Sequence, residues 1–107
     1  MNDRKLDLVL ATLRRQLEEI YGERLVRMVL YGSRARGEAE PGSDIDVLIV
    51  LKGPVNPGEE ITRTGGVVAD LSLQFDGVVS CFFMDEERFT HRHGPFLRNI
   101  RREGIIV

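Results

Sequence analysis

The sequence predicts one α/β domain of two or three layers, spanning residues 1–107, in which helices alternate with buried strands. At 107 residues the chain is long enough for one hydrophobic core but short for two. Segments with apolar residues three or four positions apart alternate with short, continuous apolar runs. Hydrophobic residues make up 42% and charged residues 30% of the chain. This balance is ordinary for a folded domain, so we do not expect disorder.

The first segment has the pattern of an amphipathic helix followed by a buried strand. The helix would be capped by Asn2 or Asp3 and would end at Gly22. Strands covered on both faces are expected over Leu25 to Tyr31 and Ile45 to Leu51, because both runs are apolar without alternation. The apolar residues that recur at helical spacing are Leu6, Leu10, Leu13, Leu17 and Ile20.

The middle of the chain predicts a loop, a second long helix and a third strand. The loop covers Lys52 to Gly58 and contains two prolines, and the helix covers Glu59 to Phe75. A glycine pair at 65–66 predicts a kink or a close backbone contact inside this helix. The strand covers Val78 to Met84 and follows a turn at 76–77. The face of the helix that meets the core should carry Ile61, Val68, Leu71 and Phe75.

The last segment predicts two helices and an edge strand. A short helix is expected over Asp85 to Thr90, and Pro95 fits the first turn of another helix that Gly104 can end. The run Ile105 to Val107 would then form an edge strand, which leaves open pairing with a second copy of the chain, and hence a homo-oligomer.

Charge and apolar content exclude several classes of protein. With 15 basic and 17 acidic residues the net charge is −2, which disfavours general binding of nucleic acid. No run approaches the roughly 20 apolar residues that cross a membrane, and the first residues lack the apolar stretch of a signal peptide. Cys81 is the only cysteine, so no internal disulfide is expected and its place in an apolar run indicates a core residue. We therefore expect a cytoplasmic protein.

Two carboxylates at the start of the second strand form the first candidate site. Asp44 and Asp46 are one residue apart, so both side chains should point to one face of the sheet while Ile45 and Val47 point to the other. Two like charges held together repel each other unless a cation or a shared proton compensates. Hard oxygen ligands of this type suit Mg²⁺ bridged to substrate phosphates.

A second candidate site lies at the end of the first strand. Gly32 and Ser33 open a small, polar segment that has room for one helical turn and a loop. Free backbone N–H groups and a hydroxyl at such a position can bind phosphate oxygens, and glycine permits a close approach. If the two strands are neighbours, this cradle and the carboxylate pair face one ligand.

These residues resemble a known family. Gly32 to Gly37 followed by Ser43-Asp44-Ile45-Asp46 and an apolar strand resembles the DNA polymerase β superfamily of nucleotidyltransferases, especially its minimal, single-domain members. The specific part of the resemblance runs from Leu30 to Val50. It implies an α+β nucleotidyltransferase fold with a mixed central sheet and flanking helices, and an enzyme that transfers a nucleoside monophosphate from a triphosphate to a hydroxyl.

The resemblance also assigns roles to residues. Asp44 and Asp46 would be catalytic and would hold Mg²⁺. The resemblance implies a site for two metal ions, and the residues present support one of these ions better than the other. Gly32 and Ser33 would hold the phosphates of the nucleoside triphosphate, with ATP as the expected donor. Either of two arginines, Arg34 and Arg36, would neutralise phosphate charge. The base specificity and the acceptor cannot be read from the sequence.

The family usually supplies a third carboxylate from a later strand, and this sequence has none there. Ser80 stands at the expected place, while Asp70 and Asp76 are candidates to replace it, although they also fit a solvated helix residue and a turn residue. This departure leaves a second function open, a nucleotide-binding module that masks or regulates a partner without catalysis. Similar minimal family members pair as antitoxins with a small helical HEPN protein, which the resemblance implies as a partner.

Two further patterns favour structural interpretations. His91 and His93 are the only histidines, and no cysteine or carboxylate cluster with zinc spacing joins them. Four phenylalanines lie in or beside apolar runs without interleaved basic residues, so we expect them in the core rather than on a base-stacking surface. These are Phe82, Phe83, Phe89 and Phe96.

Overall fold

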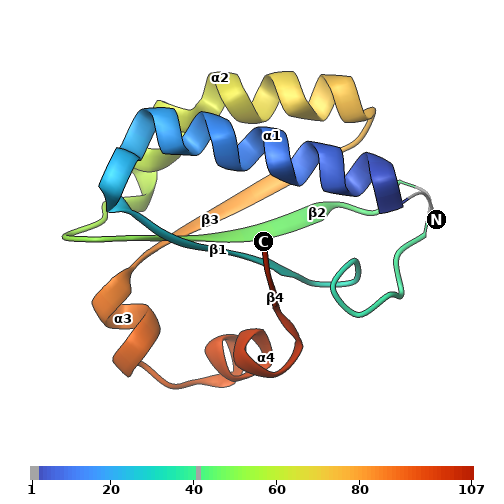
Figure 1. Ribbon diagram of the computed structural model, residues 1–107. Coiled ribbons are helices and arrows are strands. Elements are labelled where there is room, and N and C mark those ends of the chain that lie inside the picture. Colours follow the sequence, from blue (N-terminus) through green and yellow to red (C-terminus); the bar gives the residue numbers. More distant parts are fainter. Residues whose placement is uncertain (1–2, 41) are drawn as a thin grey trace.

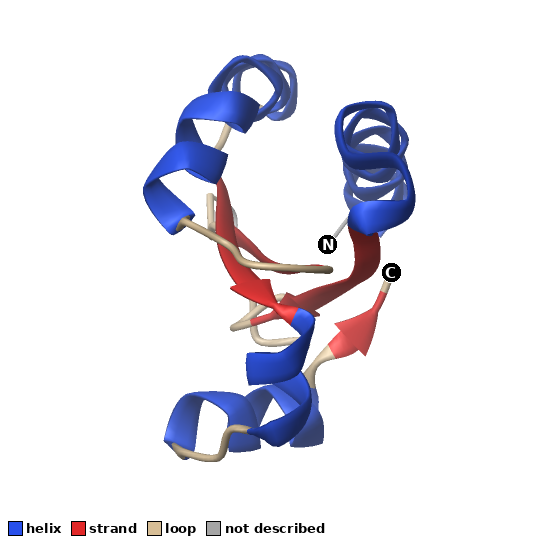
Figure 2. Ribbon diagram, turned by 90° about the vertical axis from the view of Figure 1, so that its left-hand side faces the viewer, coloured by secondary structure: helices blue, strands red, loops and turns tan. Residues whose placement is uncertain are grey.

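A mixed four-stranded sheet separates two helical layers in the computed structural model, which describes residues 3–40 and 42–107 (Figure 1). Figure 2 shows the helices in two groups on opposite sides of the strands. The three-layer arrangement confirms the predicted α/β class. The elements are α1 (Asp3–Tyr21), the 3-10 turn η1 (Gly22–Arg24), β1 (Leu25–Tyr31), β2 (Ile45–Leu51), α2 (Pro57–Phe75), β3 (Val79–Asp85), α3 (Glu86–His91), α4 (Pro95–Glu103) and β4 (Ile105–Ile106).

The strand order is β3-β2-β1-β4, with β2 parallel to β3 and β1 antiparallel to both of its neighbours. In this topology the end of β1 and the beginnings of β2 and β3 lie at one edge of the sheet. Tyr31 in β1 pairs with Asp46 in β2, which pairs with Ser80 in β3. The candidate residues of the sequence are thereby placed on adjacent strands.

Each central strand is buried on both faces, as the apolar runs predict. Met28 and Leu30 face the cluster formed with α1 and α2, whereas Val29, between them, faces the cluster formed with α4. In β2, Val47 packs in the cluster with α1 and α2, and Leu48 packs in the cluster with α4. This alternation follows from the two-residue period of a strand, and it fixes which side chains reach the α3–α4 face.

Helix α1 confirms its predicted apolar face except at the last turn. Leu13 and Leu17 are fully buried, whereas Ile20 is 36% exposed because α1 ends one residue later, at Tyr21. Gly22 follows with a positive φ of 55°, a conformation that favours glycine. The predicted caps, Asn2 and the side chain of Asp3, lie outside what the structure describes.

Helix α2 begins two residues earlier than predicted, since Asn56 Oδ1 accepts hydrogen bonds from the Gly58 and Glu59 amides. The prediction that Ile61 faces the core was wrong, because Ile61 is 58% exposed and Glu60 is buried in its place. The Glu60 carboxylate accepts a 2.7 Å hydrogen bond from the Tyr21 hydroxyl and pairs with Arg63 at 3.1 Å. A hydrogen-bond donor and an opposite charge of this kind offset the cost of removing the Glu60 charge from water.

The glycine pair in α2 makes no close contact of the kind that we expected as one alternative to a kink. The helix is continuous from Pro57 to Phe75, and a Cβ added at Gly65 or Gly66 would meet no atom within 4 Å among the described residues. The close-contact alternative was therefore wrong, and a kink at the pair stays a prediction. The helix tolerates both glycines because packing of its buried face, which includes Thr64 and Leu71, stabilises it.

The C-terminal strand completes the sheet within its own chain. Val29 pairs with Ile106, and the Val107 amide donates to the Met28 carbonyl oxygen at 3.0 Å. The short helix α3 runs one residue past its predicted end, and Gly104 ends α4 as predicted. None of the helices in the described part of the chain combines the length and the apolar composition that a membrane span requires.

The aromatic residues divide between the core and the surface. Phe83 is 3% exposed and packs in the α1–α2 cluster, as predicted. Phe82 and Phe96 are 45% and 39% exposed, so the prediction that they belong to the core was wrong. Phe82 points to the opposite face from Phe83 because side chains alternate along β3, and the short helices α3 and α4 cover that face incompletely.

Candidate functional site

The pairing of β1 with β2 brings the two predicted parts of the site into contact. Tyr31 lies opposite Asp46, so Gly32 follows directly beside that aspartate. Gly32 has a φ of +77°, and a Cβ added there would lie 2.5 Å from Asp46 Oδ2. The Asp46 carboxylate therefore rests against the Gly32 backbone, in space that only glycine leaves open. The two strands are neighbours, which is the condition under which we expect the cradle and the carboxylate pair to face one ligand.

The segment after β1 forms one tight turn that does not continue into a helix. The Ala35 and Arg36 amides donate to the Gly32 carbonyl oxygen at 3.1 and 3.2 Å, and the Glu38 amide donates to the Ser33 carbonyl oxygen at 2.9 Å. Within residues 3–40 and 42–107, no hydrogen bond involves the Ser33 amide or hydroxyl. A donor pair that faces no partner at the end of a strand suits an anion.

Arg34 has a structural role, because its side chain binds the protein backbone and is shielded from solvent. Its side chain is buried, and its Nε and Nη2 atoms donate to the Ser43 carbonyl oxygen at 3.1 and 2.9 Å. The guanidinium also lies 5.2 Å from the centre of the Phe75 ring. Because Ser43 immediately precedes Asp44, Arg34 ties the turn after β1 to the entrance of β2. Sequence reasoning did not reveal this role, since an arginine beside a glycine-rich turn fits phosphate binding equally well.

Arg36 lies at the outer edge of the same turn. Its guanidinium pairs with Glu38 at 3.3 Å and with Glu103 at 3.6 Å, and all three side chains are partly exposed. Exposed ion pairs contribute little stability, about 0 to 1 kcal/mol. Arg36 can therefore exchange these partners for a more strongly charged ligand at small cost.

The two aspartates differ in their surroundings. Asp44 is exposed immediately before β2, whereas Asp46 is half-buried within it. Burial, and secondarily the negative charge of Asp44, raises the pKa of Asp46 above its usual value. The pKa of Tyr31 is also raised, chiefly by burial and next by the Asp46 charge. A compact cation would relieve the charge repulsion that both shifts reflect.

A third acidic ligand is not provided by the residues that the structure describes. No group of three or more histidine, cysteine, aspartate or glutamate side chains is placed to hold a metal ion in residues 3–40 and 42–107. Asp70 is exposed on α2, and Asp76 forms the left-handed C-cap of that helix with a φ of 60°. Ser80, which pairs with Asp46, stands on the neighbouring strand as the sequence predicts.

Replacement of Gly32 tests the contact with Asp46. We expect Gly32→Ala to lower the free energy of unfolding more than Gly37→Ala, a matched control with a φ of +72° and nothing within 4 Å of an added Cβ. Each variant should lose about 1–3 kcal/mol from the strained φ, but only Gly32→Ala adds the clash. Urea unfolding measures both. Adding Asp46→Ala should restore stability to Gly32→Ala but not to Gly37→Ala. Equal losses of stability in the two glycine variants, with no restoration by Asp46→Ala, would contradict the contact.

The raised pKa of Asp46 predicts how stability depends on pH. The folded state holds this proton more tightly than the unfolded state, so ionisation of Asp46 disfavours folding above its folded pKa. Asp46→Asn should therefore be more stable than the native chain at pH 7 in EDTA. The difference should shrink as the pH falls through the folded pKa and vanish below the unfolded value of about 3.9. A difference that grows on acidification would contradict the assigned direction. Asp7→Asn, an exposed site on α1, is the control.

Comparisons with known proteins agree with this geometry. The family model described as "Nucleotidyltransferase domain" matches residues 10–104. The "Putative protein adenylyltransferase MJ0604" of Methanocaldococcus jannaschii is 33% identical over 92 residues, which cover 85% of this chain and 86% of that protein. The "Putative protein adenylyltransferase MJ1305" of the same organism is 32% identical over 75 residues, or 70% of this chain. This chain matches about half of that second relative, 49% of its length.

A solved structure shares the fold. The crystal structure of a toxin-antitoxin with AMP-PNP superposes with a TM-score of 0.60 at 14% identity, covering 99% of this chain and 72% of that chain. At this identity the likeness establishes the fold alone. The family model spans nearly the whole chain and includes the turn at Gly32 and the two aspartates. The chain therefore belongs to the nucleotidyltransferase domain family.

Proposed function

We propose that this protein transfers AMP from ATP, bound with Mg²⁺, to a hydroxyl group of a partner protein. The observation that carries the proposal is the Asp46 carboxylate, which lies against Gly32 beside the open donors of Ser33. The names of the Methanocaldococcus jannaschii relatives support a protein as acceptor. The likeness to a toxin-antitoxin crystallised with AMP-PNP supports ATP as donor.

The carboxylate pair fits a magnesium ion that arrives with the nucleotide. Mg²⁺ is commonly held by one or two carboxylates, with water and substrate phosphates as the other ligands. Asp44 and Asp46 supply two carboxylates, and burial, followed by the charge of Asp44, raises the pKa of Asp46. When bound, Mg²⁺ would supply positive charge against the phosphate oxygens. Asp44 and Asp46 are the residues that we propose to hold it.

The chain's own residues orient the triphosphate in this proposal. The Ser33 amide and hydroxyl bind the terminal phosphates, and Gly32 lets them approach the backbone. Arg36 exchanges its exposed carboxylate partners for phosphate charge. Arg34 acts as a positioning residue, because its two hydrogen bonds to Ser43 hold the turn beside Asp44.

The reaction that these residues serve is a substitution at the α-phosphorus. The acceptor hydroxyl oxygen forms a bond to the α-phosphorus, and the bond from that phosphorus to the oxygen bridging the α- and β-phosphates breaks. Pyrophosphate leaves, and the hydroxyl proton is released to water. Catalysis then depends on positioning and on charge stabilisation, which dominate phosphoryl-type transfers.

Ser80 supports a second function from a different class. It pairs with Asp46 at the place where a third carboxylate would complete the site, so nucleotide can bind where turnover is slow or absent. In this alternative the protein binds nucleotide and masks a partner without modifying it. The HEPN-type partner and the cytoplasmic location that we expect from the sequence are compatible with either function.

Thermal unfolding with ATP and Mg²⁺ tests the nucleotide site. At a ligand concentration of 100 times the dissociation constant, binding only to the folded state should add about 2.7 kcal/mol to the stability. We expect this gain in the native chain and its loss in Asp44→Asn/Asp46→Asn. Asp7→Asn/Glu19→Gln, which removes two exposed carboxylates on α1, should keep it. No gain in the native chain, or an equal gain in the first variant, would refute the site.

Ser80→Asp distinguishes the two functions. If the chain is an enzyme that lacks its third ligand, this substitution should raise the rate of transfer from α-labelled ATP on the order of tenfold or more, because the new carboxylate would help to hold a metal ion. Ser80→Asn, of nearly equal size, should leave the rate unchanged. Absence of transfer from the native chain and both variants, with ATP binding retained, would favour the masking function over the transferase.

A further inference from the structure

Two exposed aromatic side chains lie beside the acidic site on the same face of the sheet. Phe82 is two residues after Ser80 in β3, so both side chains point to the face covered by α3 and α4. The ring centres of Phe82 and Phe96 are 5.3 Å apart, and Phe96 lies 5.5 Å from Tyr31, the partner of Asp46. We refer to Phe82 and Phe96 as the aromatic surface. It is continuous with the carboxylate site.

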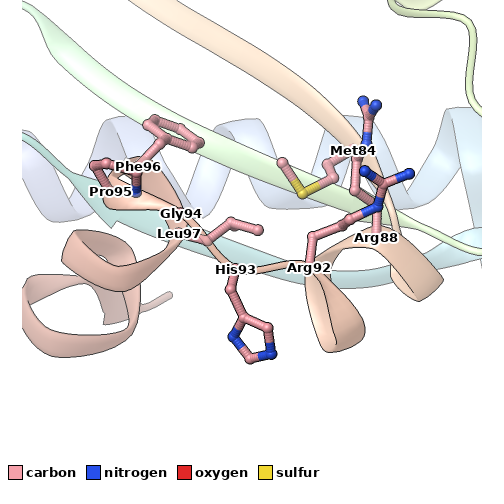
Figure 3. A pocket seen from close by; sticks show the side chains of 8 residues that line it. All are labelled: Met84, Arg88, Arg92, His93, Gly94, Pro95, Phe96 and Leu97. Atoms are coloured by element: carbon pink, nitrogen blue, oxygen red, sulfur yellow. The ribbon is translucent and has the colours of Figure 1, made fainter.

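A basic pocket follows the aromatic surface in the direction away from the carboxylates. It has a volume of about 260 Å³. Figure 3 shows the side chains of Arg88 and Arg92 extending to the same side of it, past Met84, while the His93 ring points away. The lining residues that matter here are Met84, Leu97 and Phe96, which give an apolar floor, and Arg88 and Arg92, which give a basic rim.

The two arginines of this rim, Arg88 and Arg92, are not engaged in ion pairs within the described residues 3–40 and 42–107. The Asp85 carboxylate accepts the Arg88 backbone N–H as the cap of α3, and Asp85 and Glu87 line a neighbouring hollow together with both arginines. Arg88 lies in α3 and Arg92 is the C-cap of that helix, so two like charges are held near each other and repel. An anion placed between them would remove that repulsion.

The surrounding sequence concentrates positive charge on this side of the molecule. Residues 88–102 contain no aspartate or glutamate, although the chain as a whole has a net charge of −2. The arginines of this segment are Arg88, Arg92, Arg98, Arg101 and Arg102. A local basic region on an acidic protein favours a specific anionic partner over general attraction of polyanions.

We propose that the aromatic surface and the pocket of Arg88 and Arg92 hold the acceptor segment of the partner protein, with an acidic side chain bound between the two arginines. The inference rests on the proposed function and adds the class of acceptor to it. Ser80 stands beside Asp46, and Met84 is four residues further along β3. At about 3.3 Å per residue this is roughly 13 Å, so an extended segment carries its acidic side chain about four residues from the modified hydroxyl.

A protein segment fits this surface better than a nucleic acid does. Two guanidinium groups match the oxygens of a carboxylate, and the exposed rings suit apolar side chains between the acid and the hydroxyl. A nucleic acid would place further phosphates along the same path, toward Asp44 and Asp46. Those carboxylates would repel the phosphates. Only two of the five arginines in residues 88–102, Arg88 and Arg92, line the pocket, whereas a phosphate backbone is usually followed by a stripe of basic groups.

Peptide titration followed by NMR tests the proposal directly. The probes are unstructured ten-residue peptides with one tyrosine hydroxyl and a pair of aspartates four residues away, on either side, joined by leucine and glycine. Matched peptides carry lysines in place of the aspartates. We expect saturable shifts at Phe82, Arg88, Arg92 and Phe96, with an affinity at least tenfold higher for an aspartate peptide. Absence of saturable shifts, or equal affinity for the lysine peptides, would overturn the proposal.

Two double variants with the same change in net charge test which arginines cause the preference for the aspartate peptides. Arg88→Glu/Arg92→Glu should abolish the preference for aspartate. Arg15→Glu/Arg98→Glu changes the net charge equally at exposed residues outside the pocket and should retain the preference. Loss in both variants would indicate general electrostatic attraction and overturn the proposal. Tighter, pocket-dependent binding of a single-stranded RNA oligonucleotide would also overturn it, in favour of a nucleic-acid acceptor.

The peptide titration is independent of catalysis. Asp44→Asn/Asp46→Asn should bind the aspartate peptide as the native chain does, because the contact with the pocket needs neither ATP nor Mg²⁺. Failure of ATP to stabilise the native chain would therefore count against the proposed function alone. Failure of the peptides to discriminate would count against the acceptor surface alone.

Discussion

Antiparallel pairing between β1 and β2 is the constraint on which the candidate site depends. It brings residues that are distant in the sequence into direct contact, with Tyr31 opposite Asp46 and Gly32 against the Asp46 carboxylate. The pairing is well determined, because both strands are buried on both faces and a shift of one residue would exchange their two apolar sets. The energy of the core therefore fixes the geometry of the site.

The two sides of the site carry different kinds of side chain. On the β1 side, Ser33 presents open donors and Arg34 is committed to holding the turn. On the β3 side, Ser80 pairs with Asp46, and Phe82 follows on the same face. The first side suits the triphosphate, and the second suits an acceptor. Nucleotide binding is accordingly better supported by the residues present than rapid turnover is.

The sequence predicted the features that depend on local pattern, such as strands and motifs. It predicted less well the features that depend on tertiary contacts, such as which side chains are exposed. The strands at Leu25 and Ile45 and the two-aspartate motif followed from periodicity and spacing. The exposure of Ile61 and Phe82 did not, because it depends on how a helix is rotated and how much of a face the short helices cover. The structural role of Arg34 depends on a carbonyl nine residues away, which no local pattern reveals.

The most direct test of the account measures where a metal–nucleotide complex binds. With Mn²⁺ and AMP-PNP, paramagnetic broadening of the backbone NMR signals should be strongest at Gly32, Ser33 and Asp46 and should require both ligands. Lys52 and Asp85, at the opposite end of the strands, should be broadened least. Broadening centred elsewhere, or identical without the nucleotide, would contradict the claim that the ends of β1 and β2 form one site for a metal-bound triphosphate.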